Sequence, residues 1–459
     1  MIKRCIKQNK QVEIKRSSGI NFLGDDMYLK VRSKFLFSLT IAIIWAAFSI
    51  WASQYWFNDL SKATGEELAF FLIAFIAIVP GFMNAFMFSS LVFDKRPPRK
   101  HLEHYPDLSI LIPCFNEEAY IAETIESVCK QEYAGKIEVI VIDDGSTDRT
   151  VSIVAELEKT IPYLRLLPIP KNQGKAAALN LGLQRSMYDK VITIDADSYL
   201  YKDALARIVE RYESDPVGTC AVAGTTLVRN SRDNWLTQSQ EWDYFHGIAT
   251  VKRVQSLNQG TLVAQGCFSL FDKAKLVEVG GWPDTVGEDI VLTWALLEKG
   301  YRVGYCEDAI IFTVVPSTLG GLIRQRQRWA RGMIEAFKFH PGILLKPRLS
   351  TFFIWWDLFF PLMDLTFTFV FLPGIILALF GHFWIVGPMT LSLFPIAFIL
   401  NWIMFHTETK MFEAQGLHVR KNILGFLIYL LPYGMILQPA AVIGYVYEVL
   451  GFKKEWGTK

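Results

Sequence analysis

The sequence predicts an α/β domain, built on a mostly parallel sheet with flanking helices, that is inserted between transmembrane α-helices. Long apolar runs lie near both ends of the 459-residue chain, and its middle alternates short β-type runs with amphipathic segments. The composition, 51% hydrophobic and 14% aromatic, is rich for a soluble protein. We divide the chain into a basic cytosolic segment (1–34), two transmembrane helices (35–93), a cytosolic α/β domain that ends in an amphipathic helix (94–340) and about three membrane segments (341–459).

The two N-terminal spans are predicted from length and from the absence of charge. The segments Phe35–Phe57 and Ala69–Phe93 each exceed the about 20 apolar residues that cross a bilayer. The first 34 residues carry nine Lys and Arg residues, whereas the loop between the spans carries one, Lys62. Further basic residues follow the second span, among them Arg96 and Arg99. This charge bias predicts a multi-pass plasma-membrane protein whose N-terminus and central domain face the cytosol.

Beyond residue 350 the chain is apolar again. Spans are expected at about Ile354–Phe380, Phe383–Phe405 and Leu424–Leu450. Three crossings from the cytosol would leave the C-terminus outside, whereas its lysines favour the inside. The first of these spans also contains acidic residues and prolines, so it is either broken or partly interfacial. The sequence leaves the C-terminal topology open.

The central domain reads as alternating strands and helices. Strands are expected at 108–115, 136–145, 164–170 and 190–197. Apolar spacing and capping residues predict helices between them, at about 117–131, 146–160 and 174–186. This order favours an open, largely parallel sheet. In such sheets ligands bind beyond the carboxyl ends of the strands.

Acidic residues follow the strands at that edge. Asp143 and Asp144 follow the second strand, and Asp195 and Asp197 follow the fourth. Like charges gathered at one edge are costly unless a cation or hydrogen-bond donors neutralise them. Carboxylate oxygens without a nearby His or Cys favour Mg²⁺ or Mn²⁺ together with substrate phosphates. The segment Ser146–Asp148, by contrast, is typical of a helix cap.

Several classes of function are disfavoured. No Gly-rich loop of the GxGxxG or Walker type occurs where a nucleotide site would need it, which argues against a dinucleotide site or ATP hydrolysis. The net charge of +2 gives no global field that would attract nucleic acid. The six cysteines are scattered without a CxxC pair, so neither a zinc site nor a disulfide framework is expected.

The motifs taken together identify a family. IPCFNEE, VIDDGSTD, NQGKAAALN, IDADSYL, VGEDIVLTW and QRQRW occur in this order over about residues 106–335. Each motif is weak alone, but the ordered set, ending just before membrane spans, resembles the membrane-embedded processive glycosyltransferases of family 2. That family includes synthases of poly-N-acetylglucosamine, chitin oligosaccharides, hyaluronan and cellulose. The resemblance implies a GT-A fold and a UDP-sugar donor.

The resemblance also implies roles for the donor-side residues. Asp143 and Asp144 look like the carboxylates that recognise uridine, and Lys175 matches a position near the donor nucleotide. Asp195 and Asp197 form the DxD motif, in which Asp197 would bind Mg²⁺ or Mn²⁺ and Asp195 would support the uridine side.

On the acceptor side, Asp289 in the GED motif matches the catalytic base, with Glu288 a less favoured alternative. A base is needed because inverting transfer deprotonates the acceptor hydroxyl as it attacks the anomeric carbon. Gln325, Arg328 and Trp329 are the QxxRW residues. A guanidinium stabilises the departing diphosphate, and a flat indole offers a platform for a sugar ring. The loop residues expected at the acceptor pocket are Gln265, Gly266 and Cys267.

The stretch RQRQRWARGM, residues 324–333, is predicted to divide its arginines between two tasks. Gln325, Arg328 and Trp329 are three and four residues apart, so on a helix they share one face, which we expect to look into the cleft. Arg324 and Arg331 share another face and are expected to meet lipid phosphates at the cytosolic membrane surface.

The favoured function is a synthase of poly-β-1,6-N-acetylglucosamine, whose terminal spans would form a channel for the polymer. Alternatives are a hyaluronan, chitin-oligosaccharide or β-glucan synthase and a non-processive lipid-carrier glycosyltransferase. A protein of another class, a nucleotide-sensing transporter or receptor, would leave the carboxylates unexplained. The expected partners are a UDP-sugar donor, the growing polysaccharide, the lipid bilayer and a small membrane helper subunit, with no nucleic acid.

Overall fold

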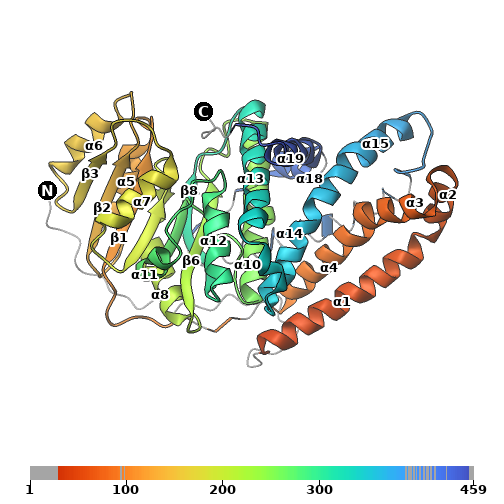
Figure 1. The fold of residues 1–459 in the computed structure, drawn as a ribbon, viewed down its shortest axis with the longest axis horizontal. Coiled ribbons are helices and arrows are strands. Elements are labelled where there is room, and N and C mark those ends of the chain that lie inside the picture. The colour runs from red at the N-terminus through yellow and green to blue at the C-terminus, as the bar shows by residue number, and fades with distance from the viewer. Residues whose placement is uncertain are drawn as a thin grey trace.

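The computed structural model describes residues 29–387 except 94, 95 and 98, isolated residues between 388 and 419, and residues 420–453 except 431. Most of the basic N-terminal segment and most of the expected span Phe383–Phe405 therefore lie outside the described residues. The molecule is elongated, with a sheet and its helices at one end and long apolar helices at the other (Figure 1).

An eight-stranded mixed sheet is formed by the described residues, in the order β3-β2-β1-β4-β7-β6-β8-β5. Its strands are β1 (Leu108–Cys114), β2 (Ile137–Asp143), β3 (Leu164–Pro168), β4 (Lys190–Ile194), β5 (Tyr199–Leu200), β6 (Thr219–Val228), β7 (Phe268–Asp272) and β8 (Arg302–Thr313). The first four neighbours are parallel, as the sequence predicts. Strand β7 runs antiparallel to both of its neighbours, and β5 runs antiparallel to β8. The expected mostly parallel sheet is thus confirmed, with these two reversed strands.

Helices cover both faces of the sheet, because alternate residues of a strand point to opposite faces. On β1, Ile110 and Ile112 join one buried cluster, whereas Leu111 joins the other. The three expected helices are present as α5 (Ile121–Cys129), α6 (Thr150–Glu158) and α7 (Lys175–Arg185). The remaining helices of the domain include α8 (Ala204–Ser214), α9 (Trp235–Trp242), α10 (Val251–Leu257), α11 (Lys273–Glu278), α12 (Glu288–Glu298) and α13 (Leu319–Phe339).

Three helical stretches among the described residues are long and apolar enough to cross a membrane. They are α1 (Val31–Ala52), the stretch Glu66–Val92 that ends in α4 (Val79–Val92), and the stretch Leu349–Leu379 that contains α14 (Leu349–Thr366) and α15 (Leu372–Leu379). The last stretch is continuous despite its prolines, with a π-helical segment at Phe367–Phe371. All three extend away from the sheet along the long axis of the molecule (Figure 1).

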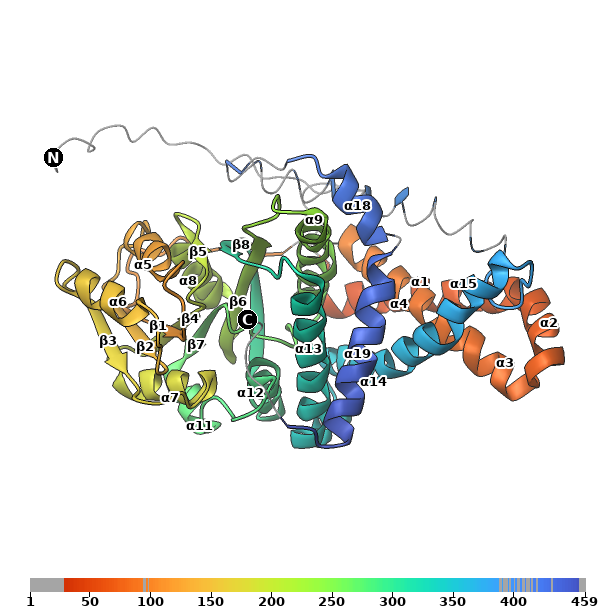
Figure 2. The same cartoon turned by 90° about the horizontal axis from the view of Figure 1, so that it is seen from above.

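A fourth apolar stretch is bent. Helices α18 (Ile423–Leu430) and α19 (Tyr433–Val449) meet at 51°. In both views α19 lies beside α13, and both helices run across the long axis rather than along it (Figure 2). Gly444 allows this close packing, because a Cβ there would lie 2.5 Å from the Gln327 carbonyl oxygen of α13.

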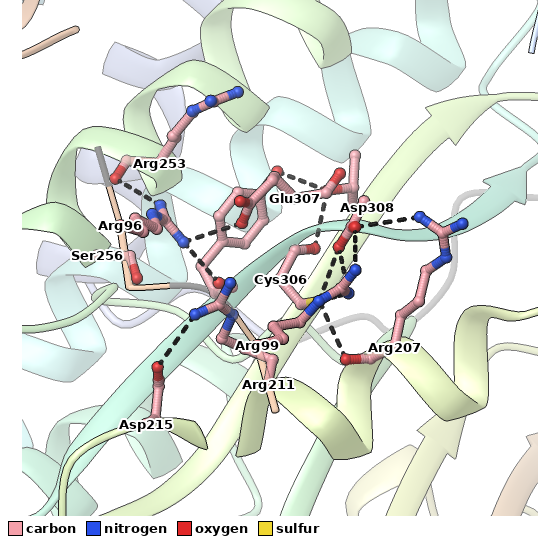
Figure 3. Close-up of polar contacts among 12 residues, drawn as sticks. Arg96, Arg99, Arg207, Arg211, Asp215, Arg253, Ser256, Cys306, Glu307 and Asp308 are labelled. Atoms are coloured by element: carbon pink, nitrogen blue, oxygen red, sulfur yellow. Dashed lines mark hydrogen bonds and ion pairs between the residues drawn. The ribbon is translucent and has the colours of Figure 1, made fainter. Parts of the chain in front are cut away.

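The linker between α4 and β1 is fastened to β8 by two arginines (Figure 3). Arg96 bridges Glu307 at 2.9 Å, and Arg99 makes two hydrogen bonds to Asp308 at 2.7 and 2.6 Å. Asp308 also binds Arg207 of α8 at 3.0 Å. These acids lie where the register of β8 against β6 shifts, so a local irregularity of the strand turns them toward the linker.

Candidate active site

The carboxyl ends of β1, β2 and β4 meet at one edge of the sheet. Three other elements cover this edge: the loop 263–267 before β7, the start of α12, and α13. The backbone N–H of Asp195 donates to the Cys267 carbonyl at 3.3 Å, which joins the end of β4 to that loop. The expected convergence of the acidic strand ends is therefore present, and the residues of the GED motif reach it from α12.

The two acids after β2 organise the neighbouring loops. The Asp143 carboxylate accepts hydrogen bonds from the N–H groups of Gly145 and Ser146 at 3.2 and 3.1 Å. The Asp144 carboxylate accepts from the N–H groups of Gln173 and Gly174 at 2.8 and 2.7 Å. Burial raises the pKa of Asp144, and these two hydrogen bonds oppose the rise. Both carboxylates are buried; Asp143 holds the turn that follows β2, and Asp144 holds the loop that leads into α7.

The turn after these acids leads into α6, but the N-cap residue is Arg149 and makes no side-chain capping bond, so the cap predicted at Ser146–Asp148 is not formed in that way. Asp148 accepts from the Thr150 N–H at 2.9 Å at the start of α6, and from the Glu118 N–H at 3.1 Å. The Ser146 hydroxyl accepts from the Asn116 N–H at 2.9 Å. The polar turn after β1 is thus tied to the turn after β2, which fixes the rim of the cleft.

Lys175, the first residue of α7, links the DxD motif to the GED motif. Its ammonium lies 2.6 Å from Asp195 and 3.5 Å from Glu288. Burial alone would lower the pKa of Lys175, but the two carboxylates raise it above its ordinary value, so it stays protonated. It also lies directly beneath Gly266, where a Cβ would approach the ammonium to 2.8 Å.

Asp197 lies at the far side of the DxD turn, where the Thr313 hydroxyl of β8 donates to its carboxylate at 3.2 Å. No group of three or more His, Cys, Asp or Glu side chains that could hold a metal occurs among the described residues. A divalent ion at Asp197 would therefore take most of its ligands from phosphates and water, which suits Mg²⁺ and Mn²⁺. The oxygen donors present fit such an ion.

The adjacent acids of the GED motif lie in different surroundings. Glu288 is buried, and burial raises its pKa, with Lys175 opposing the rise. Asp289 faces the loop 263–267 instead, and its carboxylate accepts from the Gly266 N–H at 3.3 Å. Glu288 also lies close to this loop, since a Cβ on Gly266 would be 3.5 Å from its carboxylate, but the hydrogen bond from the Gly266 N–H goes to Asp289.

The acceptor loop is held by a buried lysine that sequence reasoning missed. Lys252 of α10 donates to the Val263 carbonyl at 3.0 Å and to the Gln265 side chain. The Gln265 amide in turn donates to the Gly224 carbonyl at 2.8 Å and to the Thr226 hydroxyl at 2.6 Å. Burial lowers the pKa of Lys252 to about 8. No motif around Lys252 signals this role, because its partners lie elsewhere in the chain.

Cys267 packs within this loop rather than acting as a nucleophile. Its sulfur lies 3.1 Å from the Thr226 hydroxyl, and burial raises its pKa to about 12. The thiol is therefore protonated near neutral pH, and a protonated thiol is a poor nucleophile. Cys267 therefore contributes packing to the loop.

Helix α13 carries the QxxRW residues, and neighbouring side chains hold its tryptophan in place. Gln325 is buried, whereas Trp329 is 41% exposed. The Arg326 guanidinium lies 4.2 Å from the centre of the Trp329 ring and forms an ion pair with Asp243. Arg326 therefore supports the indole. A helical wheel could not reveal Asp243, because it comes from a separate π-helical segment, Asp243–Thr250.

Two glycines and a buried acid fasten α13 to the GED loop. Glu335, fully buried, accepts from the Gly287 N–H at 2.9 Å. A Cβ on Gly332 would lie 2.7 Å from the Gly287 Cα, so the two backbones can approach only without side chains. The position of Asp289 thus depends directly on α13.

The prediction for Arg331 is wrong. Its side chain is buried and binds Glu448 of α19 at 3.3 Å and the carbonyls of Phe452 and Lys453 at 2.8 and 3.1 Å. A buried guanidinium needs such hydrogen-bond acceptors. The prediction failed because helical periodicity shows which residues share a face but not which element packs on that face. Arg324, which was predicted to share that face, is exposed.

The chain is similar in sequence to known glycosyltransferases. Residues 109–280 match the family model described as glycosyl transferase family 2. The chain is 34% identical over 289 residues to the poly-β-1,6-N-acetyl-D-glucosamine synthase of Staphylococcus aureus, an alignment that covers 60% of this chain and 67% of that protein. It is 35% identical over 270 residues to the Staphylococcus epidermidis synthase of the same name, covering 56% and 64% of the two chains.

Among solved structures, a mannosyltransferase from Pyrobaculum calidifontis in complex with GDP-Man and Mn²⁺ aligns with a TM-score of 0.56. The alignment covers 83% of this chain and 99% of that one, at 20% sequence identity. At this identity the likeness is one of fold alone.

Proposed function

The chain belongs to glycosyl transferase family 2, and from this membership we propose that it is a processive inverting glycosyltransferase that polymerises UDP-N-acetylglucosamine into poly-β-1,6-N-acetylglucosamine. The observation that carries the proposal is the 34% identity to the staphylococcal synthase over 67% of its length. The mixed sheet with flanking helices is the GT-A-like fold that the family implies.

On the donor side, we assign the UDP moiety to the edge formed by β2, β4 and α7. Asp143 and Asp144 shape the loop that would hold uridine, and Lys175 keeps Asp195 in place through the 2.6 Å ion pair. A bound Mg²⁺ or Mn²⁺ at Asp197 would neutralise charge on the diphosphate. Arg328, on α13, would stabilise the same diphosphate as it leaves, because a guanidinium can bind phosphate through two parallel hydrogen bonds.

On the acceptor side, Asp289 is the proposed base. Its carboxylate would accept the proton of the acceptor hydroxyl while that oxygen attacks the anomeric carbon. The Gly266 N–H holds this carboxylate at 3.3 Å, which orients it at the acceptor loop. Glu288 is engaged with Lys175 and is proposed to set the local charge rather than to move the proton.

The chain end would rest on Trp329. Its exposed indole is braced from behind by Arg326, so its open face offers a flat surface on which a sugar ring can stack. Gln325 and the loop 265–267 complete the acceptor region in this assignment. Holding the chain end after each addition is what makes synthesis processive.

We further propose that the catalytic domain lies in the cytosol and that the apolar helices span the plasma membrane and enclose the path of the polymer. The three long apolar helices and the positive charge that flanks them support this placement. A small membrane helper subunit remains part of the proposal.

The test is incorporation of sugar. Membranes containing the protein are incubated with Mg²⁺ or Mn²⁺ and one labelled UDP-sugar at a time, and the product is digested with linkage-specific glycosidases. We expect label from UDP-N-acetylglucosamine alone, in a polymer that a β-1,6-specific hexosaminidase degrades. A polymer of another sugar or linkage would replace the product assignment, and no incorporation from any UDP-sugar would overturn the function.

A further inference from the structure

Two neighbouring cavities lie where the apolar helices meet the catalytic domain, outside the cleft described above. The first is an open cavity of about 320 Å³ whose lining combines basic and polar residues with apolar ones such as Leu349. Its basic and polar residues include Arg32 at the start of α1, Gln259, and Lys346 and Arg348 just before α14. No acidic residue lines it. In the described part of the chain, no ion pair neutralises Arg32, Lys346 or Arg348.

The second cavity, about 250 Å³, is lined only by apolar side chains. It lies among α1, α4 and α14, which are side by side in both views (Figures 1 and 2). Its walls include Ala46 of α1, Phe82 of α4, and Trp356 and Phe359 of α14. Phe352 lines both cavities, so the basic chamber adjoins the apolar one at this side chain.

The basic cavity is built rather than incidental. Arg348 donates to the carbonyls of Gly300 and Tyr301, the latter at 2.6 Å, and the Leu349 N–H donates to the Gln259 side chain at 3.0 Å. These contacts fix the start of α14 against the catalytic domain. Arg348 meets only carbonyl oxygens there, so its positive charge remains available to an anion.

The two cavities are spaced like the parts of a lipid. Arg32 and Ala46 are about 21 Å apart along α1, at about 1.5 Å per residue. One leaflet, including its headgroups, is about 20–22 Å thick, half of a whole bilayer. The basic cavity therefore lies at headgroup level when the apolar cavity reaches toward the middle of the membrane.

We propose that this pair of cavities binds one anionic phospholipid of the leaflet that faces the catalytic domain. Its phosphate lies among Arg32, Lys346 and Arg348, and one acyl chain fills the space between α1, α4 and α14. The charge of the first cavity selects an anionic headgroup, and the apolar lining of the second selects a hydrocarbon chain. This lipid site is independent of the sugar chemistry.

The experiment uses the full-length protein, purified and delipidated in a neutral detergent, with lipid retention followed by native mass spectrometry. The probes are phosphatidylglycerol and phosphatidylcholine with identical chains, and inorganic phosphate as a competitor. We expect phosphatidylglycerol to bind at least about tenfold more tightly than phosphatidylcholine. We also expect Arg32→Gln/Lys346→Gln to remove most of that preference. Equal binding of the two lipids would overturn the proposal, and displacement of the lipid by inorganic phosphate would show a site for free phosphate instead.

Matched variants distinguish the contributions of the two cavities to lipid binding. Ala46→Phe fills the apolar chamber and should weaken phosphatidylglycerol binding, whereas Ala47→Phe places the same ring on the exposed side of α1 and should not. Lys30→Gln/Lys299→Gln removes two exposed charges that do not line the basic cavity and should leave the lipid preference intact. UDP binding by every variant checks that the fold is retained. If Ala46→Phe and Ala47→Phe bind the lipid equally, the chain does not occupy the cavity and the proposal fails.

Discussion

Adjacent residues of one helix turn can have separate tasks when they face different partners. Glu288 lies 3.5 Å from the Lys175 ammonium inside the domain, while Asp289 touches the backbone of the acceptor loop. Burial raises the pKa of Glu288, so its basicity does not exclude it as the proton acceptor; its position disfavours it, because its carboxylate pairs with the buried Lys175. Asp289 accepts a hydrogen bond from the acceptor loop and forms no ion pair in the described part of the chain, which is why we assign it the proton transfer.

We expect Asp289→Asn to lower polymer synthesis by at least about 100-fold, because general bases contribute about 10²–10⁴ in rate. The amide keeps the shape of the side chain, so UDP affinity should stay within about twofold of that of the parent chain. Labelled-sugar incorporation and calorimetric UDP titration measure the two effects. Asp284→Asn, which alters an exposed carboxylate nearby, should leave both unchanged. Retention of a tenth or more of the activity in Asp289→Asn would contradict the assignment.

The buried Lys252 predicts how the free energy of unfolding depends on pH. Burial lowers its pKa from 10.5 to about 8, so between these values the unfolded chain holds a proton that the folded chain has released. Stability therefore rises with pH across this window, by about 3 kcal/mol for a shift of this size. Below about pH 8 both states are protonated, and this group causes no slope.

We expect the thermal midpoint of Lys252→Met to lack that rise between pH 8 and 10.5. Scanning fluorimetry of the purified full chain at several pH values measures it. Lys202→Met, which alters an exposed lysine just before α8, should keep the slope of the parent chain. An unchanged slope in Lys252→Met would mean that another group causes the dependence.

Residues whose partners are close in sequence or at strand ends could be predicted, and the others could not. Asp143 and Asp195 lie at the predicted edge because the ends of parallel strands meet there, while their roles in binding stay predictions. The surroundings of Arg331 and Lys252 could not be predicted, because they come from α19 and from the loop before β7. The pattern of a single helix records its own faces but not the element that packs on each of them.

At the scale of elements, α13 connects the cleft to the rest of the molecule. One side meets the GED loop through Glu335 and Gly332, and another meets α19 through Arg331 and Gln327. A helix packed on two sides transmits a shift of either neighbour to the other. Movement of α19 would thus alter the position of Trp329.

Gly332→Ala tests this contact. The added Cβ would meet the Gly287 backbone at 2.7 Å, so α13 must move away from α12. We expect a stability loss of about 1–3 kcal/mol, as for overpacked sites, and a fall in polymer synthesis that exceeds any loss of UDP binding. Gly320→Ala on the same helix meets only the flexible Arg324 side chain, at 3.5 Å, and should be harmless. Equal effects of the two substitutions would contradict the role of this close approach.

The elements themselves were largely predictable from sequence. The first four strands and the three helices between them follow local apolar periodicity, and each is present. The reversed direction of β7 and the pairing of β8 beside β6 were not predictable, because they depend on long connections through α9–α10 and α12. Local patterns specify an element, whereas its neighbours in a sheet are specified by packing.

At the scale of the whole molecule, the contacts of the bent pair α18 and α19 help to place the C-terminal helices, whose topology the sequence leaves open. Before α18, the Asn422 side chain donates to the Gln238 carbonyl of α9 at 2.8 Å, and after α19 the Lys453 carbonyl accepts from Arg331. Both ends of the pair thus touch the catalytic domain. We propose that the pair lies at the membrane surface, on the side of the catalytic domain.

Cysteine labelling tests the orientation of the whole chain. In intact cells, a membrane-impermeant maleimide should react with Lys62→Cys, which lies on the exposed helix Gln54–Thr64 between the first two spans. The native Cys129 is exposed on α5 and should react only after the cells are permeabilised. The chain without the added cysteine sets the background. Labelling of Cys129 in intact cells would reverse the orientation.

The arginine linkage between the linker and β8 has a consequence for the donor side of the cleft. Arg96 and Arg99 bind Glu307 and Asp308, on the strand that ends at Thr313 beside Asp197. One continuous strand therefore connects the segment that follows the second apolar stretch with the acid proposed to hold the metal.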